Sequence, residues 1–486
     1  MMVHWIKKYS LLVVVCCIQS LSNMLFSQES GIGVYDDNGW SIILPSPDSR
    51  IIYVSSSEGD DSNNGLSEES PVESIEHGAS LLRDGFPDHL LLKAGDSWIL
   101  EQSLGNFKSG RSVREPMLIS YYGGGERPLI KAEKPLVHVR NEHRSHLAFI
   151  GLEFYAFKHD PNSPEYVSKN GVSGISFIGS SGENLLIEDC KFNYAQMGAY
   201  TTGRGRDGNL KNFNFRRNIA IHSWAGDSYY IHELRTRVQG MYISGVEGIL
   251  VEENLFDHNG WNEQVDSAGA TMYNHNIYMS TQNPGSDKII VRGNILARAS
   301  AHGLQLRSGG MVENNLFVQN AINLNVGYHK NTSLPGSKAV VINNVFQEVM
   351  LMDSTNSSYP RTASVRGIGE ITIPARIENN LFSHCLNEAQ FGVDDYQDKW
   401  GFGGKLEAKN NIVYKWTDKN DQPREEWPDP ERTIASYHQS IGKQASTIGF
   451  LREARKRPLK TWWAAYAAQT VNNYLRDGYN MKELKK

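Results

Sequence analysis

The strongest constraint on the fold is a short motif that recurs along the chain. It consists of an apolar residue, two variable residues, a position usually occupied by Asn, one more residue and a second apolar residue. The Asn position falls at Cys190, Asn218, Asn254, Asn294, Asn315, Asn344, Asn380 and Asn411, and a weaker copy of the motif spans Phe149 to Phe154. Successive motifs are separated by 28, 36, 40, 21, 29, 36 and 31 residues. A minimum spacing that all motifs share, with a variable number of additional residues between them, is typical of a solenoid whose coils carry loops of different lengths.

The segments around the motif predict β-strands, because they alternate with a period of two and are rich in Val, Ile and Phe. A coil of three short strands and three turns needs about twenty residues, which fits the shortest spacing. A helical solenoid would need two amphipathic helices per repeat, and these segments lack a helical period. Stacked turns lie about 4.8 Å apart, where an Asn amide can hydrogen-bond the neighbouring backbone and tolerates left-handed dihedral angles. We therefore predict a right-handed parallel β-helix.

The region before the repeats supports this fold. Residues 51–98 contain an apolar strand, a turn rich in Gly, Asp and Asn, a short helix after Pro71, and a strand region with Gly95 and Asp96. This succession resembles the N-terminal entry of many secreted proteins in the pectate-lyase-like β-helix superfamily. With the repeats, the resemblance covers roughly residues 50–415. It implies a capping helix at the open end of the stack and glycans bound along a strand face between long loops. The superfamily holds lyases, hydrolases, epimerases and non-enzymes, so the resemblance is weak for chemistry.

The chain divides into four parts. Residues 1–27 are predicted to be a signal peptide, with Lys7 and Lys8 before the apolar run 11–18, so we expect a secreted or periplasmic protein. Residues 28–50 form a lead-in, 51–422 the β-helix, and 423–486 a linker and a helical tail. Helical spacing covers 434–450, 451–457 and 461–475. We expect the tail to lie on the β-helix or to close its far end; a Trp-bearing sugar-binding appendage is the alternative.

Composition excludes several classes of protein. Charge is nearly balanced, with 49 Lys and Arg against 54 Asp and Glu and a net charge of −5, so a generally basic nucleic-acid binder is excluded. Four cysteines in 486 residues cannot form a disulfide scaffold. Removal of the signal peptide leaves Cys190 and Cys385, which we expect to be free thiols, with one disulfide as the alternative. No later apolar segment is long enough to cross a bilayer. We expect a monomer without stable membrane insertion.

Candidate functional residues gather on one strand of each coil. Alternation places Tyr242, Tyr278, Gln305 and Asn325 in one outward file and Arg307 in the next. His275 and His302 begin their strands at equivalent positions of successive coils, so we expect them to be close neighbours. The catalytic candidates are His275, Tyr278, His302 and Arg307. The candidates for binding substrate are Tyr242, Gln305, Asn325, Arg237, Trp261 and His329.

These residue types favour eliminative cleavage of an acidic polysaccharide that contains uronic acids. Arg307 could neutralise the carboxylate, His275 or His302 could take the C5 proton, and Tyr278 or Tyr242 could protonate the leaving oxygen. Some lyases of the superfamily instead use calcium with a Lys or Arg base, and Asp257, Glu263 and Asp266 supply oxygen ligands for that case, although their spacing matches no metal motif. The strip is also compatible with a glycoside hydrolase that uses two loop carboxylates, or with a non-catalytic glycan-binding or cell-surface β-helix.

Overall fold

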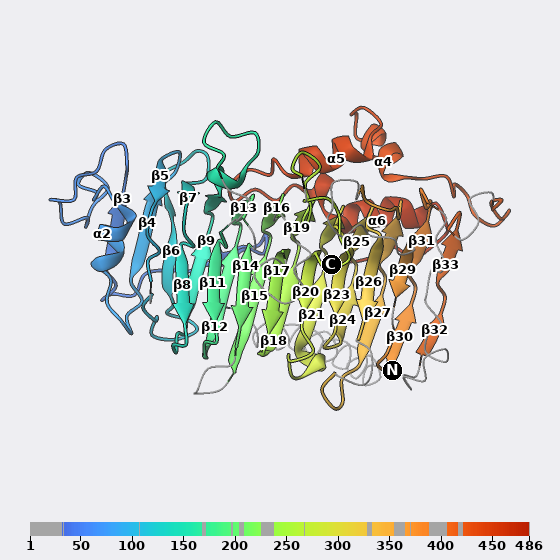
Figure 1. Ribbon diagram of the computed structural model, residues 1–486, viewed down its shortest axis with the longest axis horizontal. Coiled ribbons are helices and arrows are strands. Elements are labelled where there is room, and N and C mark those ends of the chain that lie inside the picture. Colours follow the sequence, from blue (N-terminus) through green and yellow to red (C-terminus); the bar gives the residue numbers. More distant parts are fainter. Residues whose placement is uncertain are drawn as a thin grey trace, which may run out of the picture.

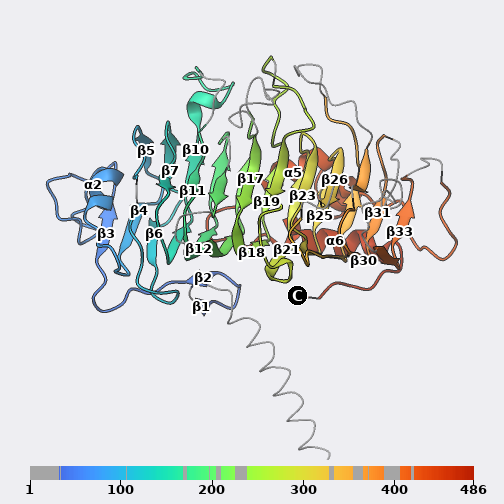
Figure 2. The same ribbon diagram turned by 60° about the horizontal axis from the view of Figure 1, so that its bottom comes forward.

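The chain forms a parallel β-helix with three long faces (Figures 1 and 2). The computed structural model describes residues 32, 34–105, 107–167, 172–195, 198–203, 209–224, 238–266, 268–327, 333–353, 365–369, 371–387, 406–416 and 421–485. The predicted signal peptide, Arg237 and His329 lie outside these ranges. From β8 onward the described strands follow one another through the three faces in the same order, and we call these faces sheets I, II and III.

Sheet I carries the candidate residues of the outward file together with His275 and His302. Its described strands are β8 (Val137–Arg140), β11 (Ile175–Ile178), β14 (Ala199–Thr202), β17 (Gln239–Ser244), β20 (His275–Met279), β23 (His302–Leu306), β26 (Ile322–Val326) and β29 (Arg366–Gly369).

Sheet II follows sheet I in each coil. It contains β3 (Ile51–Val54), β4 (His89–Lys93), β6 (Met117–Tyr122), β9 (Leu147–Ile150), β12 (Gly182–Glu188), β15 (Leu210–Arg216), β18 (Val246–Glu252), β21 (Ile289–Arg292), β24 (Gly310–Glu313), β27 (Ala339–Ile342), β30 (Ala375–Glu378) and β32 (Leu406–Lys409).

Sheet III completes the coil with short strands. It contains β5 (Ser97–Leu100), β7 (Leu129–Ala132), β10 (Glu153–Tyr155), β13 (Lys191–Asn193), β16 (Ile219–Ile221), β19 (Leu255–Asp257), β22 (Ile295–Ala297), β25 (Leu316–Val318), β28 (Val345–Gln347), β31 (Leu381–Ser383) and β33 (Ile412–Tyr414). The second apolar residue of the sequence motif lies in these strands and points into the core. Phe317 and Phe346 stack at 4.7 Å, and Phe346 and Phe382 at 4.5 Å.

The repeated Asn forms a buried ladder at the turn between sheets II and III. Asn294 is fully buried; its Oδ1 accepts from the backbone N–H of Asn254 at 2.9 Å, and its Nδ2 donates to Val251 O at 2.9 Å. The pattern repeats from Cys190 to Asn411. The expectation that this Asn itself adopts the left-handed conformation is wrong. The positive φ belongs to the preceding residue in each coil, such as Asn343 at 61°, because that residue makes the corner and the Asn fills it.

Short elements cover the stack. Helix α2 (Ile75–Ser80) caps the N-terminal end: Ser74 accepts from the backbone N–H of His77, and Ile75 is buried. A Cβ on Gly78 would stand 2.8 Å from Val54, so glycine lets this helix approach β3. The lead-in forms an antiparallel hairpin of β1 (Val34–Tyr35) and β2 (Ser41–Ile42). Two 3-10 turns, η1 (Phe157–His159) and η3 (Ser286–Lys288), lie in loops.

The helical tail lies along the flank of the solenoid, over sheet III (Figure 1). It contains α4 (Ile434–Ser440), α5 (Thr447–Ala454), the 3-10 turn η4 (Ala464–Tyr466) and α6 (Ala468–Asp477). The expected helix over 434–450 is two helices, separated at Gly442, whose φ is 80°. Phe450, Val471 and Leu475 pack on Ile219, Leu255, Ile295 and Leu316 of sheet III. Among the described residues, no helix is long and apolar enough to span a membrane.

Candidate functional site

The candidate residues of sheet I lie side by side in consecutive coils. Tyr242 pairs in register with Tyr278, Tyr278 with Gln305, and Gln305 with Asn325. His275 pairs with His302 in the same way. We call these six residues, together with Arg307, the outward strip. The sequence spacing placed them correctly because each repeat contributes one strand to sheet I.

A local irregularity brings the histidines onto the same face as the tyrosines. In a regular strand His275 and Tyr278 would point to opposite faces. Instead, the second strand position points inward like the third: Asn276 Oδ1 accepts from Asn259 at 2.9 Å, and a Cβ on Gly303 would meet Phe317 of the core at 3.0 Å. The first residue is therefore turned outward, and the His275 and Tyr278 rings lie 5.6 Å apart.

The strip contains three close contacts between functional groups. Nδ1 of His275 and Nδ1 of His302 are 2.9 Å apart. The Arg307 guanidinium lies 4.7 Å from the centre of the Tyr278 ring, a cation–π distance. The rings of Tyr242 and Tyr278 lie 5.1 Å apart. A cation, two imidazoles and two phenols thus lie on three adjacent coils, with about 4.8 Å between neighbouring strands.

The side chains of the outward strip are less exposed to solvent than those on an open strand face would be. His275 is 2% exposed, His302 7% and Tyr278 8%, whereas Tyr242 and Arg307 are half-buried. The outward file predicted from the sequence is therefore not solvent-exposed at its centre. Charges and hydrogen bonds are stronger where water is largely excluded. Gln305 Oε1 is also buried and accepts no hydrogen bond from a described residue, so a hydroxyl of a bound molecule would satisfy it.

Asp257, Glu263 and Asp266, the possible ligands for calcium, do not come together into one site in the described part of the chain. The described residues contain no cluster of three or more His, Cys, Asp or Glu side chains able to hold a metal ion. Asp257 ends β19 of sheet III and is fully buried, with its carboxylate held by Arg298 at 2.8 Å and by Arg455 at 2.5 Å. Burial alone would raise the pKa of Asp257, but the two guanidinium groups hold it well below its usual range.

The other two acids of that set are also separate. Glu263 accepts a hydrogen bond from His258 Nε2 at 2.9 Å, and this bond lowers the pKa of Glu263 to about 2. Asp266 is exposed. These acids lie near the ends of sheet III strands rather than on the strip. Sequence reasoning missed Arg455, since nothing in the tail indicates that it reaches Asp257, 198 residues away.

Trp261 has a packing role rather than an open ring face. It is 9% exposed and clusters with Ala270 and Met352. Its Nε1 donates to Arg298 O at 2.9 Å, and its ring lies 4.4 Å from that of His258.

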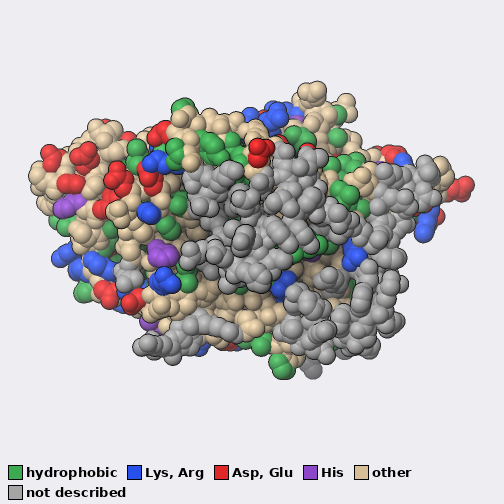
Figure 3. Space-filling view, viewed as in Figure 1, with side chains coloured by type: hydrophobic (Ala, Val, Ile, Leu, Met, Phe, Trp, Pro, Cys, Tyr) green, Lys and Arg blue, Asp and Glu red, His purple; other side chains and the backbone are tan. Residues whose placement is uncertain are grey.

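The surface over the N-terminal coils mixes basic and acidic side chains (Figure 3), so it forms no uniformly basic patch that would attract a polyanion.

Solved structures with the same fold belong to proteins with different activities. A GH136 lacto-N-biosidase from Eubacterium ramulus is 16% identical, with 75% of this chain and 68% of that chain covered and a TM-score of 0.41. The pectate lyase Pel9A is 12% identical, with 81% and 86% covered and a TM-score of 0.39. The three parallel sheets make this chain a right-handed parallel β-helix. PfbA, a surface adhesin of Streptococcus pneumoniae, also matches, at 10% identity, 68% and 82% coverage and a TM-score of 0.32. No protein family and no curated protein matches the sequence. The likeness therefore concerns the fold alone.

Proposed function

We propose that this β-helix is an exported polysaccharide lyase that cleaves a uronic-acid polymer by β-elimination on the outward strip. The observation that carries the proposal is the grouping of His275, His302, Tyr278 and Arg307 on one covered face. Elimination needs a group that neutralises the carboxylate, a base for the C5 proton and an acid for the leaving oxygen. The predicted signal peptide motivates the export.

The contacts between the histidines favour His302 as the base. Nδ1 of His275 lies 3.3 Å from the backbone N–H of His302 and 2.9 Å from His302 Nδ1. A ring nitrogen that accepts a backbone N–H carries no proton of its own, so His302 Nδ1 is the donor of the second bond. Neutral His302 then has its lone pair on Nε2. We assign C5 proton abstraction to that atom, with the tautomer inferred from this network.

Arg307 and Tyr278 take the remaining two functions. A guanidinium can bind a carboxylate with two parallel hydrogen bonds. Neutralisation of the negative charge of the carboxylate in this way makes the C5 proton more acidic. Tyr278, in contact with the Arg307 guanidinium, donates its hydroxyl proton to the glycosidic oxygen as the bond to C4 breaks. The products are a new reducing end and a sugar with a C4–C5 double bond, so no external reactant is required.

Hydrolysis fits the described strip less well. It uses two carboxyl groups across the scissile bond, and no described position of the strip is Asp or Glu. Asp257 is fully engaged with Arg298 and Arg455, so it cannot serve as an acid. The other loop carboxylates available for that reaction are Glu263 and Asp266, which lie apart from the strip, and Asp227 and Glu233, which lie outside the described residues.

The test is incubation of the purified protein with oligogalacturonate, polygalacturonate, alginate and rhamnogalacturonan, followed by near-ultraviolet absorbance and a reducing-end assay. A lyase gives both signals in equal molar amounts. His302→Ala is expected to lower the rate about 10²–10⁴-fold, the usual effect of losing a general base. His138→Ala is the matched control, because His138 lies on the same face of sheet I three strands before Tyr242.

Three results would contradict the proposal. Reducing ends without new absorbance would indicate hydrolysis. Binding without either signal would indicate a non-catalytic glycan-binding protein. Full activity of both His302→Ala and Arg307→Ala, with unchanged thermal unfolding, would place the reaction elsewhere on the molecule.

A further inference from the structure

A second, polar groove runs along the corner between sheets II and III, away from the strands of sheet I. Its volume is about 1540 Å³. One wall is the row of corner residues Asn314, Asn343, Asn379 and Asn410. The other wall is α6 with the chain from Met481 to Lys485, and the loop Asp36–Gly39 of the lead-in lies at one end. We call this the corner groove.

The row of asparagines is not explained by backbone conformation alone. These four residues have left-handed φ angles between 52° and 61°, which Asn tolerates. However, the same row contains Asp189, Arg217 and Glu253 in earlier coils, with the same conformation. A second left-handed row follows the strands of sheet III and contains Tyr194, His222, His258, Arg298, Gln319, Glu348, His384 and Lys415. Within this row, Asn occupies the four C-terminal described positions, whereas Arg217, Glu253 and Gly293 of earlier coils, which also line the groove, do not carry an amide.

Three of the four amides in this row are available to a ligand, whereas the Oδ1 of Asn314 accepts a hydrogen bond from Asn472 Nδ2 of α6 at 2.9 Å. The side chains of Asn343, Asn379 and Asn410 make no hydrogen bond to another described residue; they are half-buried or exposed. On the opposite wall the amides are engaged: Gln469 and Asn473 both donate to Leu484 O, at 3.0 and 3.1 Å. The engaged amides fix the far wall in place, and the unengaged ones face the groove at the coil spacing of about 4.8 Å.

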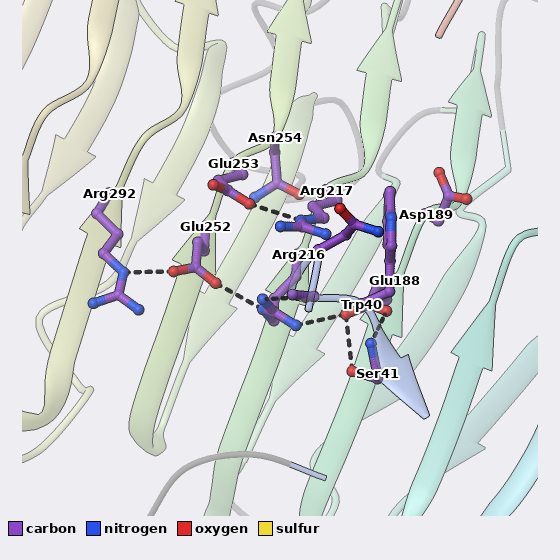
Figure 4. A network of polar contacts seen from close by, with 12 residues as sticks. Trp40, Ser41, Glu188, Asp189, Arg216, Arg217, Glu252, Glu253, Asn254 and Arg292 are labelled. Carbon is purple, nitrogen blue, oxygen red and sulfur yellow. Dashed lines mark hydrogen bonds and ion pairs between the residues drawn. The ribbon is translucent and has the colours of Figure 1, made fainter. Parts of the chain in front are cut away.

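The charged side chains at the end of the groove neutralise one another. Figure 4 shows Arg216 between Glu188 and Glu252, at 2.6 and 2.7 Å, and Arg217 bonded to Glu253 at 2.7 Å. Arg292 contacts Glu252 at 2.6 Å. Because each of these cations already has a carboxylate partner, the groove offers little net charge to an acidic polymer.

One buried donor at this end lacks a partner. Arg217 is 2% exposed, and its guanidinium lies between the rings of Trp40 and Trp462, 4.3 and 4.6 Å from their centres. Its Nε is bonded to Glu253, but its Nη1 makes no hydrogen bond to a described residue. An unpaired buried donor is costly, and the hydroxyl oxygen of a bound molecule would satisfy it.

We propose that the corner groove binds a neutral, hydroxyl-rich glycan chain that lies parallel to the solenoid axis. A sugar hydroxyl both donates and accepts, and so does an Asn amide, which makes uncharged amides in a row suited to successive sugar units. Four coils span about 14 Å of that chain. This site would hold a polymer next to the protein without taking part in the reaction on sheet I.

The test uses calorimetric titration with hexasaccharides of β-1,4-glucose, β-1,4-xylose, β-1,4-mannose and β-1,3-glucose, and with a galacturonate hexamer for comparison. At least one neutral hexamer is expected to bind. The double variant Asn343→Gly/Asn379→Gly should weaken that binding at least tenfold, since each lost neutral hydrogen bond changes affinity about fivefold. Glycine keeps the left-handed backbone, as Gly293 does in the same row with φ of 64°.

Two controls separate this site from the outward strip. Asn141→Gly makes the same change at an exposed left-handed position after β8 and should leave the affinity unchanged. His302→Ala should also bind the neutral hexamer normally, whatever it does to turnover. The proposal is overturned if no neutral hexamer binds, if the double variant binds as well as the parent, if only the galacturonate hexamer binds, or if His302→Ala abolishes binding.

Discussion

Removal of one rung of the Asn ladder tests how the solenoid is held together. Asn294 lies in the middle of the ladder and is fully buried. Its Oδ1 accepts from both the backbone N–H and the Nδ2 of Asn254, each at 2.9 Å. Asn294→Ala removes that oxygen and leaves two donors of Asn254 without an acceptor, in a corner that water does not reach.

The expected loss follows from these two donors. A buried unsatisfied donor costs about 1–3 kcal/mol, so Asn294→Ala should lower the free energy of unfolding by about 4 kcal/mol. Asn411→Ala removes the same contacts at the end of the ladder, but Asn411 is only half-buried. Water can replace part of its bonding there, and the loss should be about 1 kcal/mol.

Urea unfolding followed by circular dichroism and by tryptophan fluorescence measures both losses and detects non-coincident transitions, which long repeat arrays can show. Asn343→Gly is the control, because Asn343 adjoins the ladder without belonging to it and Gly suits its φ of 61°. Equal, small losses of stability for Asn294→Ala and Asn411→Ala would refute the reasoning. They would mean that the two donors of Asn254 find other acceptors after Asn294 is truncated.

Three further predictions concern buried ionisable groups. Asp257→Asn should destabilise the protein by about 3–5 kcal/mol at pH 7, because it leaves the half-buried Arg298 and Arg455 without this charged partner. The pKa of native Asp257 is depressed, so the stabilisation by its carboxylate is present above the unfolded pKa of about 3.9 and is lost as the pH falls further. Equal thermal unfolding temperatures of parent and variant at pH 7 would contradict the predicted destabilisation. Burial raises the pKa of Glu348, so Glu348→Gln should raise the urea midpoint at pH 7 and leave it unchanged near pH 4; a lower midpoint at pH 7 would show that the carboxylate is favourable. Burial raises the pKa of the Cys190 thiol to about 12, so native protein should label with a maleimide at least about a hundredfold more slowly at Cys190 than unfolded protein, measured by peptide mass mapping.

The fold and the register of the outward strip followed from the sequence because both depend on a local repeat. Each motif fixes one corner, and the corner aligns Tyr242, Tyr278 and Gln305 whatever the length of the loops between them. The left-handed residue was misplaced by one position, since Asn is common both in left-handed turns and in buried ladders. Spacing alone does not separate these two roles.

The role of Asp257 could not be predicted, because it depends on a docking event between distant segments. In sequence Asp257 is an acid near a loop, available to a metal or a sugar. In the structure Arg455 of the tail reaches it after α5 has docked on sheet III. A motif that spans six residues contains no information about that partner, and the same holds for Arg217 between Trp40 and Trp462.

The three faces of the solenoid differ in what their outward side chains can offer a substrate. Sheet III presents Ile219, Leu255 and Ile295, and the tail buries them. Sheet II presents Arg216 and Glu252 in a row that neutralises itself. Sheet I brings imidazole, phenol, amide and guanidinium groups together on adjacent strands. Proton transfer needs titratable groups of different kinds within reach of one bond, and this requirement favours sheet I as the reactive face independently of any resemblance to other proteins.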